Sequence, residues 1–182
     1  MKIVIHKCFW VWQFEQEEQW LNQMAAQGLN LTDMSLGRYV FEEGLPGEYQ
    51  YRLEMLENMP TAATSQQYLA FLEETGVEYI GSLLRWVYLR KKTAAGPFDL
   101  FSDLDSRLKH LRRINTLLLV LIPPCLFLGV YNICLGVRFS PLSIVNLVIG
   151  LLLVALCSLI GWGIHLITGK IRRLQQERVV RE

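Results

Sequence analysis

The sequence INTLLLVLIPPCLFLGVYNICLGV, residues 114–137, decides how the chain is organised. A second apolar stretch, LSIVNLVIGLLLVALCSLIGWGIHLIT, follows over residues 142–168. Each stretch exceeds the roughly 20 residues that cross a hydrocarbon core about 30 Å thick. A soluble buried helix is seldom apolar on all sides over such a length. We therefore predict two transmembrane helices, over residues 114–137 and 142–168.

The connection between the two stretches is short, so the helices should be antiparallel neighbours. Basic residues flank the far ends of both stretches, whereas the connection carries only Arg138. The positive-inside rule then places both termini and the N-terminal part in the cytoplasm. We expect a multi-pass protein of the cell membrane, with the lipid bilayer as a partner. The residues that set this orientation are Lys109, Arg112, Arg113, Lys170, Arg172 and Arg173.

Pro123 and Pro124 lie in the middle of the first stretch. Proline removes a backbone donor and clashes with the preceding turn, so a kink is expected there. The kink is either a hinge or a static bend filled by the neighbouring helix. The static bend is favoured, because proline is tolerated in membrane helices.

The residues before Arg113 mix charged and apolar types, as a water-soluble domain does. Alternation of period two predicts strands, and apolar residues at helical spacing predict helices. The predicted elements are strand 3–12, helix 15–27, strand 36–42, strand 48–55, helix 65–75 and strand 78–91. This βαββαβ order is that of the ferredoxin-like fold. The expected class is thus α+β, with a cytoplasmic domain over residues 1–95 and two helices covering one face of a single sheet.

The alternation gives the two faces of the predicted strands different characters. One set of positions holds aromatic residues and is expected to form the core beneath the helices. The opposite set holds Arg38, Arg52 and Arg85. These arginines are a candidate docking face for an anionic ligand, a lipid headgroup or a partner segment. The alternative is that they simply solvate an exposed face.

The sequence offers no catalytic or metal-binding motif. The formal net charge of +1 argues against a dedicated nucleic-acid binder. The four cysteines form no CxxC pair, so no disulfide framework, metal site or cofactor is predicted. Glu17 and Glu18 adjoin on a predicted helix, and we expect both to be solvated. The chain is therefore not predicted to be an enzyme.

Residues 96–113 connect the predicted domain to the first apolar stretch. Leu104, Leu108 and Leu111 recur at helical spacing among basic residues. This pattern fits an amphipathic segment at the membrane surface. It fits a plain helical stalk equally well. Residues 169–182 are predicted to form a basic cytoplasmic tail.

Several blocks of the sequence resemble a known bacterial family. They are FWVW (9–12), EQEEQWLNQMAAQG (15–28), GRYVFE (37–42), PGEYQYRL (46–53), GVEY (76–79), WVYLRK (86–91) and FDLFSD (98–103). Together they are similar to the family catalogued as domain of unknown function 2812, found mainly in Firmicutes. The resemblance implies a membrane-associated protein, often encoded beside a PadR-type transcriptional regulator. It supplies no catalytic residues.

These observations lead to two functional hypotheses. The first is a membrane-anchored interaction or sensory module whose cytoplasmic domain binds a protein partner or a small ligand. The second is an accessory or structural subunit of a membrane transport assembly, in which the helix pair makes the contacts.

Overall fold

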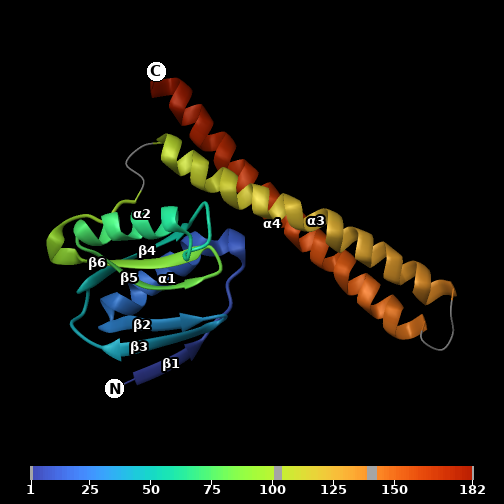
Figure 1. The fold of residues 1–182 in the computed structure, drawn as a ribbon, viewed down its shortest axis with the longest axis horizontal. Coiled ribbons are helices and arrows are strands. Elements are labelled where there is room, and N and C mark those ends of the chain that lie inside the picture. Colours follow the sequence, from blue (N-terminus) through green and yellow to red (C-terminus); the bar gives the residue numbers. More distant parts are fainter. Residues whose placement is uncertain (1, 101–103, 139–142, 182) are drawn as a thin grey trace. The chain divides into compact units, whose positions relative to one another are not determined.

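The structure, a computed structural model, describes residues 2–100, 104–138 and 143–181. The chain divides into two compact units, Met1–Ser106 and Arg107–Glu182. The first unit combines helices with two three-stranded sheets, and the second is a hairpin of two long apolar helices (Figure 1). The predicted α+β class is therefore confirmed.

The first unit contains six strands, two α-helices and two short 3-10 helices. In chain order they are β1 (Lys2–His6), η1 (Val11–Gln13), α1 (Phe14–Ala26), β2 (Leu29–Ser35), β3 (Arg38–Glu43), β4 (Tyr49–Met55), α2 (Ala63–Glu74), β5 (Val77–Leu83), β6 (Trp86–Lys92) and η2 (Thr93–Ala95). All strand pairs are antiparallel. Sheet A has the order β1-β3-β2, and sheet B has the order β4-β6-β5.

The elements of the first unit stack in four layers, α2, sheet B, α1 and sheet A, as Figure 1 shows. One apolar cluster joins α1 to both sheets, through Leu21 of the helix, Phe41 of sheet A and Leu53 of sheet B. A second cluster joins α2 to the other face of sheet B, through Leu69 and Val87. Both faces of sheet B are thus covered, whereas sheet A is covered by a helix on one face.

The first unit is a tandem of two βαββ repeats, residues 2–43 and 49–92. Both repeats place their last strand at the centre of the sheet. The hairpin register recurs at a constant shift of 48 residues: Leu31 pairs with Phe41, Tyr79 pairs with Leu89, and the register slips just after each pair. Gly28, which follows α1 at φ +82°, corresponds to Gly76 after α2, also at φ +82°. Only glycine adopts this left-handed conformation freely, so both helices end in the same way.

The predicted ferredoxin-like order of four strands in one sheet is not found. The predicted strand over residues 78–91 is two strands, because the chain turns at Leu84, whose φ is +56°. β2 was missed, because Asn30 and Asp33 interrupt its apolar pattern. The predicted first strand ends at His6, and the aromatic residues after it enter the 3-10 helix η1 instead.

Side chains of α1 form hydrogen bonds with backbone groups at the free edge of β4. The Asn22 amide donates to the Tyr51 carbonyl at 3.1 Å and accepts from the Tyr51 N–H at 2.9 Å. The Glu18 carboxylate accepts from the Leu53 N–H at 3.1 Å. Helix α1 therefore takes the place of a neighbouring strand, which is one way of protecting a sheet edge.

Two side chains of sheet B also bond to the edge of sheet A. The Leu31 N–H donates to the Tyr51 hydroxyl at 2.9 Å, and Arg90 donates to the Leu31 carbonyl at 3.2 Å. These bonds are made at the point where β2 slips its register against β3, and they tie the two repeats together.

The second unit contains α3 (Leu104–Arg138) and α4 (Ser143–Arg181). By length and composition, both are long and apolar enough to cross a membrane. α3 runs on through Pro123 and Pro124. Residues 104–113 thus belong to the same helix as the first apolar stretch. Most of the predicted tail after residue 168 is likewise helical.

The two long helices lie close together at Gly129 and Gly150. A Cβ added to Gly150 would lie 2.8 Å from the carbonyl oxygen of Gly129 and 2.8 Å from the backbone nitrogen of Ile133. Two turns further along α4, the Cys157 thiol lies 3.9 Å from the carbonyl oxygen of Ile122 on α3. These contacts make α3 and α4 an antiparallel hairpin.

Candidate functional sites

The three arginines of the predicted docking face do not share one surface. Arg38 lies on sheet A, exposed, and pairs with Asp33 at 3.4 Å. Arg52 lies on sheet B and pairs with Glu18 at 3.4 Å. Arg85 lies in the β5–β6 turn. Their binding role stays a prediction, but the single sheet face on which it was based does not exist.

Arg52 and Arg85 are also held by contacts within the domain. Arg85 donates from Nε to the Leu56 carbonyl at 2.9 Å. The guanidinium of Arg52 lies 5.9 Å from the centre of the Phe98 ring and donates to the Tyr51 carbonyl at 2.9 Å. An anion that bound either arginine would therefore compete with these contacts.

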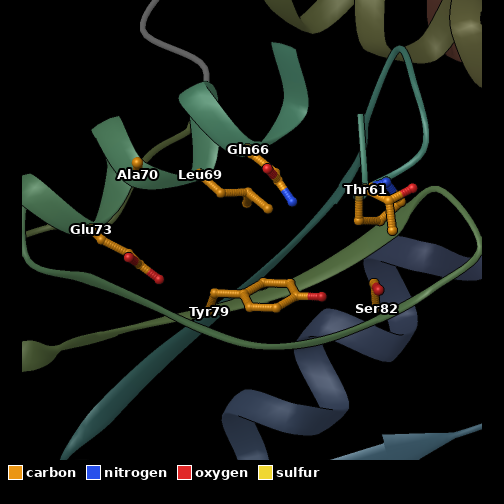
Figure 2. A pocket seen from close by; sticks show the side chains of 8 residues that line it. Thr61, Gln66, Leu69, Ala70, Glu73, Tyr79 and Ser82 are labelled. Atoms are coloured by element: carbon orange, nitrogen blue, oxygen red, sulfur yellow. The ribbon is translucent and has the colours of Figure 1, made fainter. Parts of the chain in front are cut away.

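A pocket of about 380 Å³ lies between α2 and β5. Figure 2 shows the Tyr79 side chain extended beneath α2, with Leu69, Gln66 and Glu73 directed toward it from the helix. The volume falls in the range of ordinary small-molecule sites. The residues that line the pocket are Pro60, Thr61, Gln66, Leu69, Ala70, Glu73, Tyr79 and Ser82.

The pocket combines one apolar wall with several polar groups. Leu69 is buried, whereas Tyr79 keeps 37% of its surface exposed. Thr61 and Ser82 lie at the hydroxyl end of Tyr79, and Glu73 lies at its other end (Figure 2). Sequence reasoning missed this site, because its polar residues look like an ordinary solvated surface in the sequence.

A buried carboxylate lies between the two sheets, where no titratable site was predicted. Glu17 of α1 is only 8% exposed. Its Oε1 accepts from the Tyr39 hydroxyl of sheet A at 2.6 Å and from the Tyr88 hydroxyl of sheet B at 2.5 Å. The expectation that Glu17 and Glu18 are solvated is therefore wrong. Glu17 has Leu21 and Ala25 one and two turns later on the same buried face, and this spacing was the available signal.

Burial governs the ionisation of this cluster. Desolvation raises the pKa of Glu17 above its ordinary value, although hydrogen bonds from Tyr39 and Tyr88 act in the opposite direction. Burial, together with the neighbouring Glu17, also raises the pKa values of Tyr39 and Tyr88, so both hydroxyls stay protonated as donors. Through these two hydrogen bonds, Glu17 joins α1 to both sheets.

The residues predicted to set membrane orientation gather at one end of the hairpin. Lys109 and Arg112 are exposed in the first turns of α3, and Arg172 and Arg173 are exposed in the last third of α4. Because the helices are antiparallel, these positions belong to the same end. Burial, with a smaller effect from the charge of Arg113, lowers the pKa of the neighbouring His110 to about 3. His110 is therefore neutral at pH 7 and adds nothing to this basic cluster.

The geometry defines a class of protein: an α+β domain of two βαββ repeats followed by an apolar helical hairpin. The model of the family described as protein of unknown function (DUF2812) matches residues 13–122, which is more than half of the chain. The chain belongs to this family. No curated protein and no solved structure matches it.

Proposed function

We propose that the protein is a membrane-anchored interaction or sensory module. The α3–α4 hairpin would insert into the cell membrane, and the α+β domain would bind a small ligand or a protein partner in the cytoplasm. The observation that carries the proposal is the contrast between a domain with its own apolar clusters and a hairpin with exposed apolar residues.

The exposed side chains of the hairpin support the anchor. Phe127 is 70% exposed and Leu152 is 64% exposed, both far from the helix ends. Leaving one large apolar side chain in water costs about 1.5–3 kcal/mol relative to burial. Other exposed residues of this kind are Leu119, Val120, Leu121, Leu126, Leu128, Val130, Ile144, Val145, Val148, Ile149, Leu151 and Leu156. A lipid environment would remove this cost along the whole hairpin.

The basic cluster supports a cytoplasmic orientation. Lys109, Arg112 and Arg172 belong to one end of the hairpin, and only Arg138 lies toward the other end among the residues that the structure describes. Charged residues of this kind are retained on the cytoplasmic side. The domain precedes Lys109 and would lie on the same side.

Alkaline carbonate extraction tests the anchor. The full chain should stay in the membrane pellet, and a chain that ends at residue 100 should be found in the supernatant. Recovery of the full chain in the supernatant would refute membrane insertion.

A labelling experiment tests the orientation. In a background with all four cysteines replaced, Arg138→Cys should react with a membrane-impermeant maleimide in intact cells. A version that keeps only the exposed Cys8 should react after permeabilisation. The reverse pattern would place the domain outside.

The sensory form of the proposal also draws on the family resemblance, which implies a PadR-type regulator encoded nearby. With such a regulator, ligand binding by the domain would be one step of a regulated response of the cell envelope. Expression of the chain with and without candidate ligands, read out on the neighbouring promoter, tests this link.

A transport accessory subunit is the second candidate function, and Asn132 favours it. Its amide donates to the Leu128 carbonyl of its own helix at 2.8 Å, on an otherwise apolar part of α3. Amides in membrane helices commonly hydrogen-bond to a neighbouring helix. Loss of a co-purifying membrane protein in Asn132→Leu, with the truncated domain unable to capture it, would favour this role.

A further inference from the structure

The second repeat departs from the first at the positions that line the α2–β5 pocket. At the constant shift of 48 residues, Ala25 corresponds to Glu73, Leu31 to Tyr79 and Met34 to Ser82. The three residues of the first repeat are 1%, 0% and 8% exposed and belong to its apolar core. Their three counterparts in the second repeat are polar and line the pocket.

A further lining position differs in size between the repeats. Buried Trp12, 7% exposed, corresponds to Pro60, which is much smaller. Leu21 corresponds to Leu69, so the apolar anchor of the helix on the sheet is kept in both repeats. The cavity is therefore the space that core side chains fill in the first repeat. The helix, the sheet and the hairpin register are shared by the two repeats, so the difference in these side chains accounts for much of the pocket.

The polar groups of the pocket favour a cation. The lining contains the Glu73 carboxylate and the face of Tyr79, and it includes no lysine, arginine or histidine. A carboxylate attracts an ammonium or guanidinium group, and an aromatic face attracts a cation within about 6 Å of the ring centre. Thr61, Gln66 and Ser82 offer oxygen acceptors for N–H donors.

The same lining argues for an organic cation over a metal ion. Calcium and magnesium take six or more oxygen ligands at short range, whereas Glu73 is the one carboxylate in the pocket lining. Leu69 and Pro60 add apolar surface that suits a hydrocarbon body. The volume of about 380 Å³ fits a small molecule.

We propose that the α2–β5 pocket binds a small organic cation, with an ammonium or guanidinium head at Glu73 and Tyr79 and an apolar body against Leu69. The inference rests on the proposed function, since it names the ligand class of the sensory domain. Glu73 and Tyr79 supply the selectivity for charge, and Ser82 leaves the space that the body of the ligand occupies.

Calorimetric titration of the full chain in a non-ionic detergent tests the proposal. The probes are phenethylamine, agmatine and tetraethylammonium, with 2-phenylethanol as a neutral isostere and phenylacetate as an anion. We expect at least one cation to saturate with a dissociation constant below about 1 mM, and the neutral and anionic probes to bind at least about tenfold more weakly.

Three variants locate the site. Glu73→Gln should weaken the cation by about fivefold or more, whereas Glu74→Gln, an exposed neighbour outside the pocket lining, should change it less than about twofold. Ser82→Met restores the residue of the first repeat, fills the cavity and should weaken binding at least about tenfold.

Three results would overturn the proposal: no cation with a dissociation constant below about 1 mM, equal binding of 2-phenylethanol, or equal effects of Glu73→Gln and Glu74→Gln. Carbonate extraction of the same variants distinguishes failure of the pocket proposal from failure of the proposed membrane anchor. A chain that stays in the membrane without binding cations refutes the pocket alone, and a chain that binds cations without staying in the membrane refutes the anchor alone.

Discussion

Removing the Tyr88 hydroxyl tests the buried carboxylate that joins the two repeats. In Tyr88→Phe the ring remains, but Glu17 loses the donor from sheet B and keeps only the bond from Tyr39 at 2.6 Å. Glu17 is 8% exposed, so water does not readily replace the lost donor. A hydrogen bond to a charged group contributes about 1.5–3 kcal/mol, and Tyr88→Phe should lower the free energy of unfolding at pH 7 by that amount.

The double variant gives a sharper magnitude. With Tyr39→Phe added, the carboxyl loses both donors, and the loss should exceed that of Tyr88→Phe alone; the cost of an uncompensated buried charge, about 3–5 kcal/mol, is the upper limit, because the carboxyl can take up a proton instead. Glu17→Gln in the same double variant removes the charge and should recover much of this loss. The recovery separates an effect on Glu17 from general damage to aromatic packing, because Gln leaves both phenylalanine rings in place.

The pH dependence follows from the raised pKa of Glu17. Below its ordinary value of 4.5 the carboxyl is protonated in the folded and unfolded chains, and the stabilising contribution of its neutral form is fully present. Above 4.5 the unfolded chain releases its proton first, so stability falls as pH rises until the folded pKa is passed. The slope is at most about 1.4 kcal/mol per pH unit. Glu17→Gln should remove this slope, and Tyr88→Phe should extend it to higher pH.

Urea unfolding of the full chain in detergent measures these changes. A Trp162→Phe background restricts the fluorescence signal to the domain, where Trp20 lies 4.9 Å from the Tyr39 ring. Two results would refute the reasoning. One is a cost below about 0.5 kcal/mol for Tyr88→Phe at pH 7. The other is the same slope of stability between pH 4.5 and 7 in the wild type and in Glu17→Gln.

Three further predictions concern other parts of the chain. Asn22→Ala should lower the free energy of unfolding of the domain by about 1–3 kcal/mol, because the Tyr51 N–H at the edge of β4 loses its partner and the Tyr51 carbonyl keeps only the bond from Arg52. Urea unfolding measures this loss, and a cost near zero would contradict the edge-capping role. Gly150→Leu should separate α3 from α4, because a side chain there would collide with the backbone of α3. Protease should then digest the hairpin faster, with the free energy of unfolding of the domain unchanged. Unchanged digestion would contradict the close approach. The Cys157 thiol lies 3.9 Å from the carbonyl oxygen of Ile122, which is one turn before Cys125 on α3, so copper phenanthroline should crosslink Cys125 to Cys157 within one chain. Mass spectrometry of reduced and unreduced peptides detects the crosslink, and crosslinks found only between chains would contradict the antiparallel register.

The helices were predictable to within a few residues, and the reason is their periodicity. Helix 15–27 was predicted and α1 spans Phe14–Ala26; helix 65–75 was predicted and α2 spans Ala63–Glu74. The glycines that end them mark the left-handed residue after each helix. The two apolar stretches are likewise helical over their described residues, as parts of α3 and α4.

The strands were less predictable, because turns without glycine or proline leave little signal. The β5–β6 turn consists of Leu84 and Arg85, two residues that look like the middle of a strand. The repeat was also hidden. The best sequence match between the hairpins, SLGRYVF (35–41) with SLLRWVY (82–88), is shifted by 47 residues, whereas the strand register shifts by 48. A difference of one residue exchanges the two faces of a strand, so this match would have assigned core and surface positions incorrectly.

The candidate sites could not be derived in the same way, because each depends on which layer covers which. Glu17 is buried because residues of both sheets cover the same face of α1, and sheet B supplies Tyr88 as a donor. The alternation of one strand contains no information about that distant partner. Likewise, the separation of Arg38 from Arg52 follows from the division into two sheets, and no local pattern in the sequence marks that division.

The order of the layers also explains why the pocket lies in the second repeat. The buried face of α1 packs on both sheets, so a cavity beneath it would remove contacts from the core that joins both repeats, and core cavities are costly. α2 packs on sheet B alone, and Phe71 on the helix is 58% exposed. Polar groups such as Glu73 can therefore replace core residues there and still reach water, and the cost is confined to one interface. A pocket beneath α2 is therefore less costly to the fold than one beneath α1. In this domain that is where Tyr79 and Ser82 stand in place of Leu31 and Met34.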